Sequence, residues 1–182
     1  MTGKEGAKAA RAMLDYHTEV VCGVTPRKGG QESEGKPIFN TVKEAMEFVV
    51  GQPTPTPPER GIENLVSAIY VPPFAVKEAV MEAIDNNIPL INIMAERVPI
   101  RDVAYFLAAA KEKNIQIIGP SSLGFIAPGI GRIGVVGGTL VEEIFRPGSI
   151  GIISRSGGMT NELAWQVRKA GLGQSTAVHV GG

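Results

Sequence analysis

Short apolar runs alternate with helix-like segments along most of the chain, and this alternation limits the folds open to it. The runs are rich in β-branched residues and nearly continuous, which is typical of strands buried on both faces of a sheet. They span residues 19–24, 37–42, 64–71, 89–95, 115–119, 131–136, 149–154 and 176–180. Helical patterns lie at 6–16, 41–49, 73–87, 99–114 and 159–171. This order predicts right-handed βαβ units and a doubly wound α/β fold with a parallel sheet.

Two segments interrupt the alternation. The proline-rich segment GQPTPTPPERG (51–61) cannot form a helix or an inner strand. We expect an exposed loop there, and a proline-rich ligand for a partner is the alternative. The turn-rich segment GGTLVEEIFRPGS (137–149) predicts a domain boundary, with residues 1–146 in one domain and residues 147–182 beginning a second.

The patterns at both ends of the sequence predict that the chain is a fragment of a longer protein. A glycine-rich turn at a helix start ordinarily follows a strand, and no strand pattern precedes TGKEG (2–6). At the other end, a single helical pattern follows the predicted boundary, which is only the beginning of a second α/β domain.

Composition excludes several classes of protein. The 18 Lys and Arg residues balance 18 Asp and Glu residues, which argues against a nucleic-acid-binding protein. No apolar run is long enough to span a membrane, and the N-terminus lacks the apolar core of a secretory signal. The single cysteine, Cys22, excludes an internal disulfide and a cysteine-based metal site. We expect a cytoplasmic protein that binds neither nucleic acid nor membrane, and no metal site.

Glycine-rich turns stand where ligands of doubly wound sheets bind, beyond the carboxyl ends of the strands. The turn TGKEG opens a helix and exposes backbone N–H groups that suit a phosphate, although an N-cap turn with a surface lysine is the alternative. Lys28 lies in a second such turn, GVTPRKGG (23–30), after a predicted strand. Two cationic turns at neighbouring strand ends favour a phosphate-containing ligand.

Two further strand ends point to a nucleotide. The turn in IYVPP (69–73) offers an apolar surface for a flat ring. Glu96 follows another strand, where it is placed to accept hydrogen bonds from ribose or adenine, and a solvated acid before a helix is the alternative. The chain lacks G-x-G-x-x-G, which disfavours a dinucleotide site of the NAD type.

The segment SIGIISRSGGMTNELAWQVRKAG (149–171) predicts a strand, a turn and a helix. The glycines at the turn let the backbone approach an anion at the helix start, and the serines add hydroxyl donors. This predicts a phosphate-binding turn formed by Ser154, Ser156, Gly157 and Gly158.

Six motifs, in this order, resemble the α subunit of succinyl-CoA synthetase and the matching region of ATP-citrate lyase. They are TGKEG, GVTPRKGG followed by GKPIFNTVKEA, SAIYVPPFAVKEAVMEAID, INIMAERVP, IIGPSSLGFIAPG and GIISRSGGMTNEL. The resemblance covers nearly all 182 residues. It implies a Rossmann-like CoA-binding domain over 1–146 and the start of a flavodoxin-like ligase domain over 147–182.

The resemblance also implies which residues bind ligands. Contacts with coenzyme A fall on Thr2, Gly3, Lys4, Glu5, Lys28, Val71, Pro72, Met94, Ala95 and Glu96. The turn at Ser154, Ser156, Gly157 and Gly158 faces a phosphohistidine in the family, and Asn161 occupies the position of a substrate contact.

The activity implied by the resemblance is that of a nucleotide-dependent acid–CoA ligase or lyase. An ATP-grasp β-type subunit or domain, holding ATP or GTP with Mg, phosphorylates a histidine of the ligase domain. The phosphoryl group passes to a small di- or tricarboxylic acid, and CoA then displaces it. That histidine falls downstream of Gly182, so we expect no catalytic residue in this chain, structural roles for His17 and His179, and a hetero-oligomer.

The acid substrate is predicted from departures within these motifs. Residues 157–162, 121–123 and 146–149 depart from the succinyl-CoA synthetase pattern, whereas GLGQSTAV (171–178) follows it. We expect citrate, with succinate as the alternative. A non-catalytic CoA- or nucleotide-binding module is the alternative from another class.

Overall fold

The computed structural model describes residues 2–51 and 64–182, and it confirms the predicted alternation. The predicted strand segments overlap β1 (Gly23–Val24), β3 (Lys36–Phe39), β4 (Val66–Ile69), β5 (Leu90–Ile93), β6 (Gln116–Ile118), β8 (Gly131–Gly134), β9 (Pro147–Ser154) and β10 (Gln174–His179). The predicted helical segments overlap α1 (Lys4–Asp15), α2 (Val42–Gly51), α3 (Val76–Asp85), α4 (Ile100–Glu112) and α6 (Gly157–Lys169), with ends that differ by a few residues. The fold is of the predicted α/β class.

Several short elements were not predicted from the sequence. They are β2 (Glu32–Ser33), β7 (Gly124–Ala127), α5 (Val141–Ile144) and the 3-10 turns η2 (Pro73–Ala75) and η3 (Gly138–Leu140). Such short segments carry no clear hydrophobic period, which explains why the sequence pattern does not show them.

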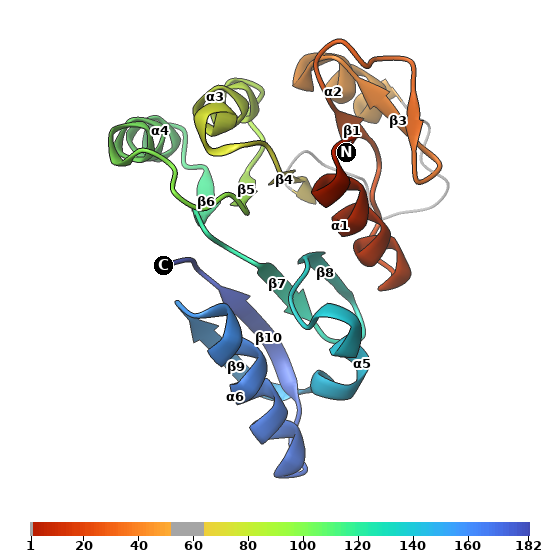
Figure 1. Cartoon of the computed structure of the whole chain (residues 1–182), viewed down its shortest axis with the longest axis vertical. Helices are drawn as coiled ribbons and strands as arrows, with labels where there is room; N and C mark the ends of the chain where they lie inside the picture. Colours follow the sequence, from red (N-terminus) through yellow and green to blue (C-terminus); the bar gives the residue numbers. More distant parts are fainter. Residues whose placement is uncertain (1, 52–63) are drawn as a thin grey trace.

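Strands β4, β5 and β6 form a parallel sheet in that order. Figure 1 shows α3 and α4 beside this sheet. Its core is apolar: Ile91 and Ile93 of β5, Val80 of α3 and Phe106 of α4 are completely buried. Helices that alternate with parallel strands in this way form the predicted βαβ units.

A second sheet contains β1, β3 and β2, with β1 parallel to β3. Strands β1 and β4 are not hydrogen-bonded to each other, so the parallel strands form two separate sheets. In doubly wound folds with the strand order 3-2-1-4-5-6, a central strand lies between the two halves of one sheet.

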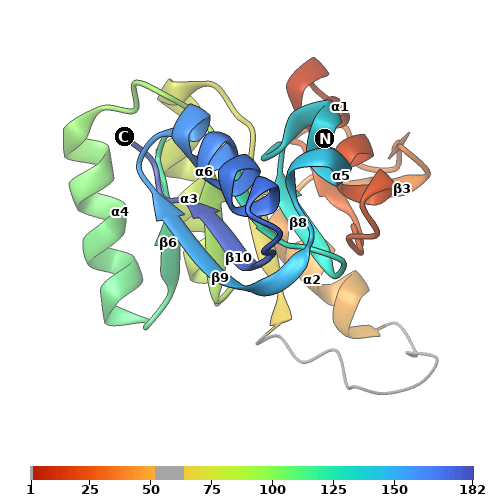
Figure 2. The same ribbon diagram turned by 90° about the horizontal axis from the view of Figure 1, so that it is seen from below.

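The third sheet has the order β8–β7–β10–β9 and is mixed. Strands β9 and β10 are parallel, whereas β7 is antiparallel to both β8 and β10. Figure 2 shows α6 lying over β9 and β10. Strands β7 and β8 precede residue 146, whereas β9 and β10 follow it, so this sheet includes strands from both sides of the predicted domain boundary. The division of the chain at residue 146 stays a prediction.

Most of the proline-rich segment 51–61 lies outside the described residues. Among the helices of residues 2–51 and 64–182, none combines the length and apolar character needed to cross a membrane.

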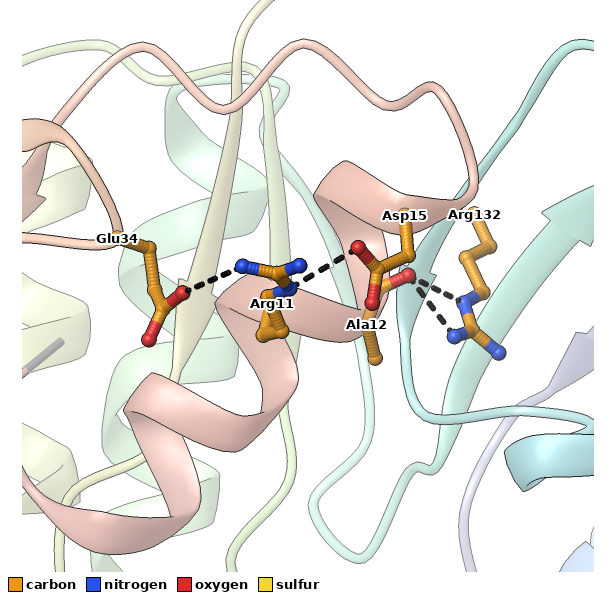
Figure 3. Close-up of polar contacts among 5 residues, drawn as sticks. All are labelled: Arg11, Ala12, Asp15, Glu34 and Arg132. Carbon is orange, nitrogen blue, oxygen red and sulfur yellow. Dashed lines mark hydrogen bonds and ion pairs between the residues drawn. The ribbon is translucent and has the colours of Figure 1, made fainter.

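Arg132 of β8 fixes the C-terminal end of α1 (Figure 3). Its Nε and Nη2 donate to the carbonyl oxygen of Ala12 at 3.1 and 2.8 Å, and Nη1 donates to the carbonyl oxygens of Val136 and Gly138. The carbonyl of Ala12 lies in the last turn of α1. Carbonyl groups in the last turn of a helix have no N–H donor within the helix. Burial lowers the pKa of Arg132, while Tyr16 and other neighbours oppose that shift. One nearly buried cation therefore joins α1 to the β7–β8 hairpin.

Replacing Arg132 tests this connection. In Arg132→Met the three carbonyl groups lose a charged donor, so we expect the free energy of unfolding, measured by urea denaturation, to fall by about 3 kcal/mol. Arg11→Ala is the matched control, because the side chain of Arg11 is 66% exposed and pairs with Asp15 and Glu34 at the surface. The control should lose less than about 1 kcal/mol. Equal losses in the two variants would contradict the role given to Arg132.

Candidate functional site

A cavity of about 300 Å³ lies where the carboxyl ends of β4 and β5 meet the start of α1. Its lining residues are Glu5, Tyr70, Val71, Pro72, Pro73, Met94 and Ala95. They come from three segments that are far apart in the sequence. The structure thus brings together five of the residues predicted to contact coenzyme A: Glu5, Val71, Pro72, Met94 and Ala95.

The walls of the cavity are held by backbone hydrogen bonds. The N–H of Met94 donates to the carbonyl oxygen of Ile69 at 3.2 Å, which keeps the ends of β4 and β5 side by side. The N–H of Ser121 donates to the carbonyl oxygen of Ala95 at 2.9 Å. After Pro72 the chain turns through η2 into α3, so the two prolines stand at the strand end as a stiff apolar surface.

Pro73 also lines the cavity, in the IYVPP turn that is predicted to offer an apolar surface, whereas Tyr70 beside it has no predicted role. The hydroxyl of Tyr70 is buried and has no hydrogen-bond partner within the described residues. Burial raises the pKa of Tyr70, and the charge of Arg132 opposes that shift. The hydroxyl therefore stays protonated at neutral pH, and its interaction with Arg132 indicates that it lies on the side of the ring nearer that residue.

The start of α1 differs from a side-chain-capped turn. Gly3 is the N-cap residue, its backbone is extended, and no side chain caps the helix. The hydroxyl of Thr2 instead lies 3.3 Å from the hydroxyl of Thr25, which follows β1. The backbone N–H groups of the first turn lack helical acceptors, so they give this edge of the sheets a positive potential.

Lys28 lies on an exposed loop after β1, and its side chain does not line the cavity. The loop itself is fixed: Lys28 N–H donates to the carbonyl oxygen of Thr25 at 3.1 Å, and Gly29 N–H donates to Asn40 Oδ1 at 2.9 Å. A Cβ on Gly29 would lie 2.3 Å from Asn40 Nδ2, so a larger residue there would displace the Asn40 side chain from this hydrogen bond.

Other predicted coenzyme A residues also lie outside the cavity lining. Lys4 and Glu96 are exposed, and the lining residues do not include them, Thr2 or Gly3. Their predicted contacts with coenzyme A stay predictions.

At the second predicted site, the serine hydroxyls organise the turn before α6. Ser156 is the N-cap, and its hydroxyl accepts from Met159 N–H at 3.4 Å. Ser154 Oγ lies 3.1 Å from both the N–H and the carbonyl oxygen of Ser156. Both hydroxyls therefore have partners within the turn. The sequence predicts them as donors to a phosphate and does not predict these contacts.

The two glycines of this turn have different roles. A Cβ on Gly157 would lie 2.4 Å from Leu123 Cδ1, so Gly157 is required by packing against the loop after β6. A Cβ on Gly158 would meet nothing within 4 Å, so Gly158 faces open space. Of the two, Gly158 is the one whose backbone an anion can approach.

Asn161, the predicted substrate contact, lies apart from the cavity. Its Oδ1 accepts from Gly137 N–H at 3.1 Å, so the side chain supports the turn that precedes η3. Across residues 2–51 and 64–182, no cluster of three or more His, Cys, Asp and Glu side chains is arranged to hold a metal ion.

In α/β folds with parallel strands, ligands, nucleotides among them, bind at the carboxyl ends of the strands, where this cavity lies. Residues 1–97 match the family described as the CoA binding domain, which is more than half of the chain. The chain belongs to this CoA-binding domain family.

Relatives in sequence have the names of ligase subunits. The alpha subunit of an ADP-forming succinate–CoA ligase from Aquifex aeolicus is 44% identical over 100% of this chain and 55% of that protein. The alpha subunit of a malate–CoA ligase from Methylorubrum extorquens is 37% identical over 100% of this chain and 57% of that protein. The chain spans about half the length of the curated relatives it matches.

A solved structure shares the fold. ATP citrate lyase from Methanothrix soehngenii, in complex with citrate and coenzyme A, matches with a TM-score of 0.78 and 25% identity. The match covers 98% of this chain and 30% of that chain. This likeness supports the predicted Rossmann-like architecture.

Proposed function

We propose that this chain is the coenzyme A-binding, α-type part of a nucleotide-dependent acid–CoA ligase. The observation that carries the proposal is the cavity. Three distant segments, each predicted to contact coenzyme A, meet there within the residues that match the CoA-binding family.

The residues around the cavity suit coenzyme A, which supplies a thiol when bound. Val71, Pro72 and Ala95 provide an apolar surface of the kind that an adenine ring packs against. The start of α1 presents backbone N–H groups toward the same edge, and Lys28 supplies a cation on the neighbouring loop. The ring of Tyr70 adds to the apolar lining of the cavity.

The remaining parts of the activity are proposals of the same kind. We propose an ATP-grasp β-type partner that holds ATP or GTP with Mg, a hetero-oligomeric assembly, and a phosphoryl group seated at the turn formed by Ser154, Ser156, Gly157 and Gly158. The names of the relatives as alpha subunits support a second subunit. The open space at Gly158 supports the seat. Residues 147–182 are proposed as the start of the ligase domain.

For the acid, we propose succinate rather than the citrate expected from the motif departures. Succinate–CoA ligase alpha subunits from several organisms are 37–44% identical to this chain, whereas the ATP citrate lyase structures are 25–28% identical. Citrate stays the second candidate because of those structures and because Asn161 departs from the succinate pattern. A non-catalytic CoA-binding module would need no phosphate seat at α6.

Removing the cation of Lys28 tests the binding of coenzyme A. We expect Lys28→Ala to weaken CoA binding, measured by calorimetry, by about 1 to 3 kcal/mol, because a charge-assisted contact with a phosphate is lost. Lys111→Ala is the control: it removes the same charge from the last turn of α4, away from the cavity, and should leave the affinity unchanged. Unchanged affinity in Lys28→Ala, or equal losses in both variants, would refute the role of Lys28.

The choice of acid is tested by turnover. In the full complex, the kcat/KM for succinate should be at least about tenfold higher than the kcat/KM for citrate or for malate. A site shaped for one acid leaves polar groups unpaired when another acid binds. Comparable or better turnover of citrate would favour the second candidate and overturn the first.

A further inference from the structure

His179, the last residue of β10, joins two segments that belong to the two predicted sites. Its Nδ1 lies 2.7 Å from the N–H of Leu123, in the loop after β6, and its Nε2 lies 3.0 Å from the carbonyl oxygen of Arg155, in the turn before α6. The residue is only 5% exposed. Both ring nitrogens of this buried side chain are therefore hydrogen-bonded to backbone groups.

These partners define the protonation of the ring. A backbone N–H can only donate, so Nδ1 must be the unprotonated acceptor. A carbonyl oxygen can only accept, so Nε2 carries the proton and donates it to Arg155. The contacts thus require one neutral tautomer, in which each nitrogen has a separate role.

On one side, this link leads to the wall of the cavity. The loop that carries Leu123 also donates from Ser121 N–H to Ala95 and from Ser122 N–H to Ile93. The hydroxyl of Ser122 lies 2.6 Å from the carbonyl oxygen of His179. A short series of hydrogen bonds therefore runs from Ala95, in the cavity, to the histidine.

On the other side, the link leads to the start of α6. The carbonyl of Arg155 precedes the N-cap Ser156, whose carbonyl oxygen accepts from Thr160 N–H at 2.9 Å. The position of a Cβ on Gly157 would lie 3.5 Å from Cε1 of the ring, so the imidazole packs against the first residue of the helix.

We propose that His179 is a positioning residue that holds the turn before α6 in register with the wall of the coenzyme A cavity. The donor at Nε2 fixes the turn, and the acceptor at Nδ1 fixes the loop. The part of this inference that concerns phosphate rests on the proposed function of the turn, whereas the positioning itself rests only on the contacts of the ring.

Two variants of similar size separate the two contacts. In His179→Asn, the amide oxygen occupies the place of Nδ1 and can accept from Leu123, but nothing reaches Arg155. In His179→Gln, the amide nitrogen occupies the place of Nε2 and can donate to Arg155, but the N–H of Leu123 loses its acceptor. A merely space-filling role would instead loosen both segments together, and more in the smaller Asn variant.

Native-state hydrogen exchange at Leu123 and Thr160 is the test. In His179→Asn, the Thr160 amide should exchange about tenfold faster and the Leu123 amide at its wild-type rate, and His179→Gln should show the reverse. Equal acceleration of both amides in both variants, or no change at Thr160 in His179→Asn, would overturn the proposal.

A titration with inorganic phosphate, followed at the Gly158 amide by NMR, separates this inference from the proposed function. The dissociation constant should rise at least about threefold in His179→Asn and stay near the wild-type value in His179→Gln. If the wild-type chain does not respond to phosphate, the proposed seat fails, and the exchange pattern still decides whether His179 positions the turn.

Discussion

The contact between the Arg132 guanidinium and the end of α1 is the interaction on which the candidate site depends. The first turn of α1 contributes Glu5 to the cavity. The last turn of the same helix is bound by Arg132, which lies 120 residues further along the chain than Ala12. A cation at a helix C-terminus is favourable because it satisfies free carbonyl groups and opposes the helix dipole. The ring of Tyr16, 5.5 Å from the guanidinium, adds a further favourable contact. The hairpin thus fixes one end of α1, while the contact of Thr2 with Thr25 holds the segment before the other end.

Buried polar groups, rather than apolar packing alone, connect the parallel sheet to the mixed sheet. Asn92 of β5, Ser122 and His179 are all buried where the two sheets approach each other. Such contacts have directional requirements, so they specify one arrangement more strongly than apolar contacts do. This arrangement explains how a cavity on one sheet and a helix start on the other keep a defined geometry.

Much of the fold could be predicted because parallel strands buried on both faces leave a continuous apolar pattern. The apolar turn in IYVPP could be located because it follows such a strand, whereas Met94 and Ala95 were implied only by the resemblance to the family. Arg132 could not be found, because its partners lie up to 120 residues away and nothing local marks it. Serine before a helix is a common N-cap, so the capping role of Ser156 has a signal in the sequence, whereas the contacts of Ser154 depend on the geometry of the turn. A few motif positions favour citrate, whereas the names of the more similar relatives favour the succinate alternative, so the acid stays a proposal.

The central claim is that coenzyme A binds in the cavity between β4, β5 and the start of α1. A crystal structure of the chain with coenzyme A tests it most directly. The account predicts that the adenine ring packs against Val71 and Pro72, with a phosphate near Lys28. Ordered coenzyme A at another place, with this cavity empty, would contradict it.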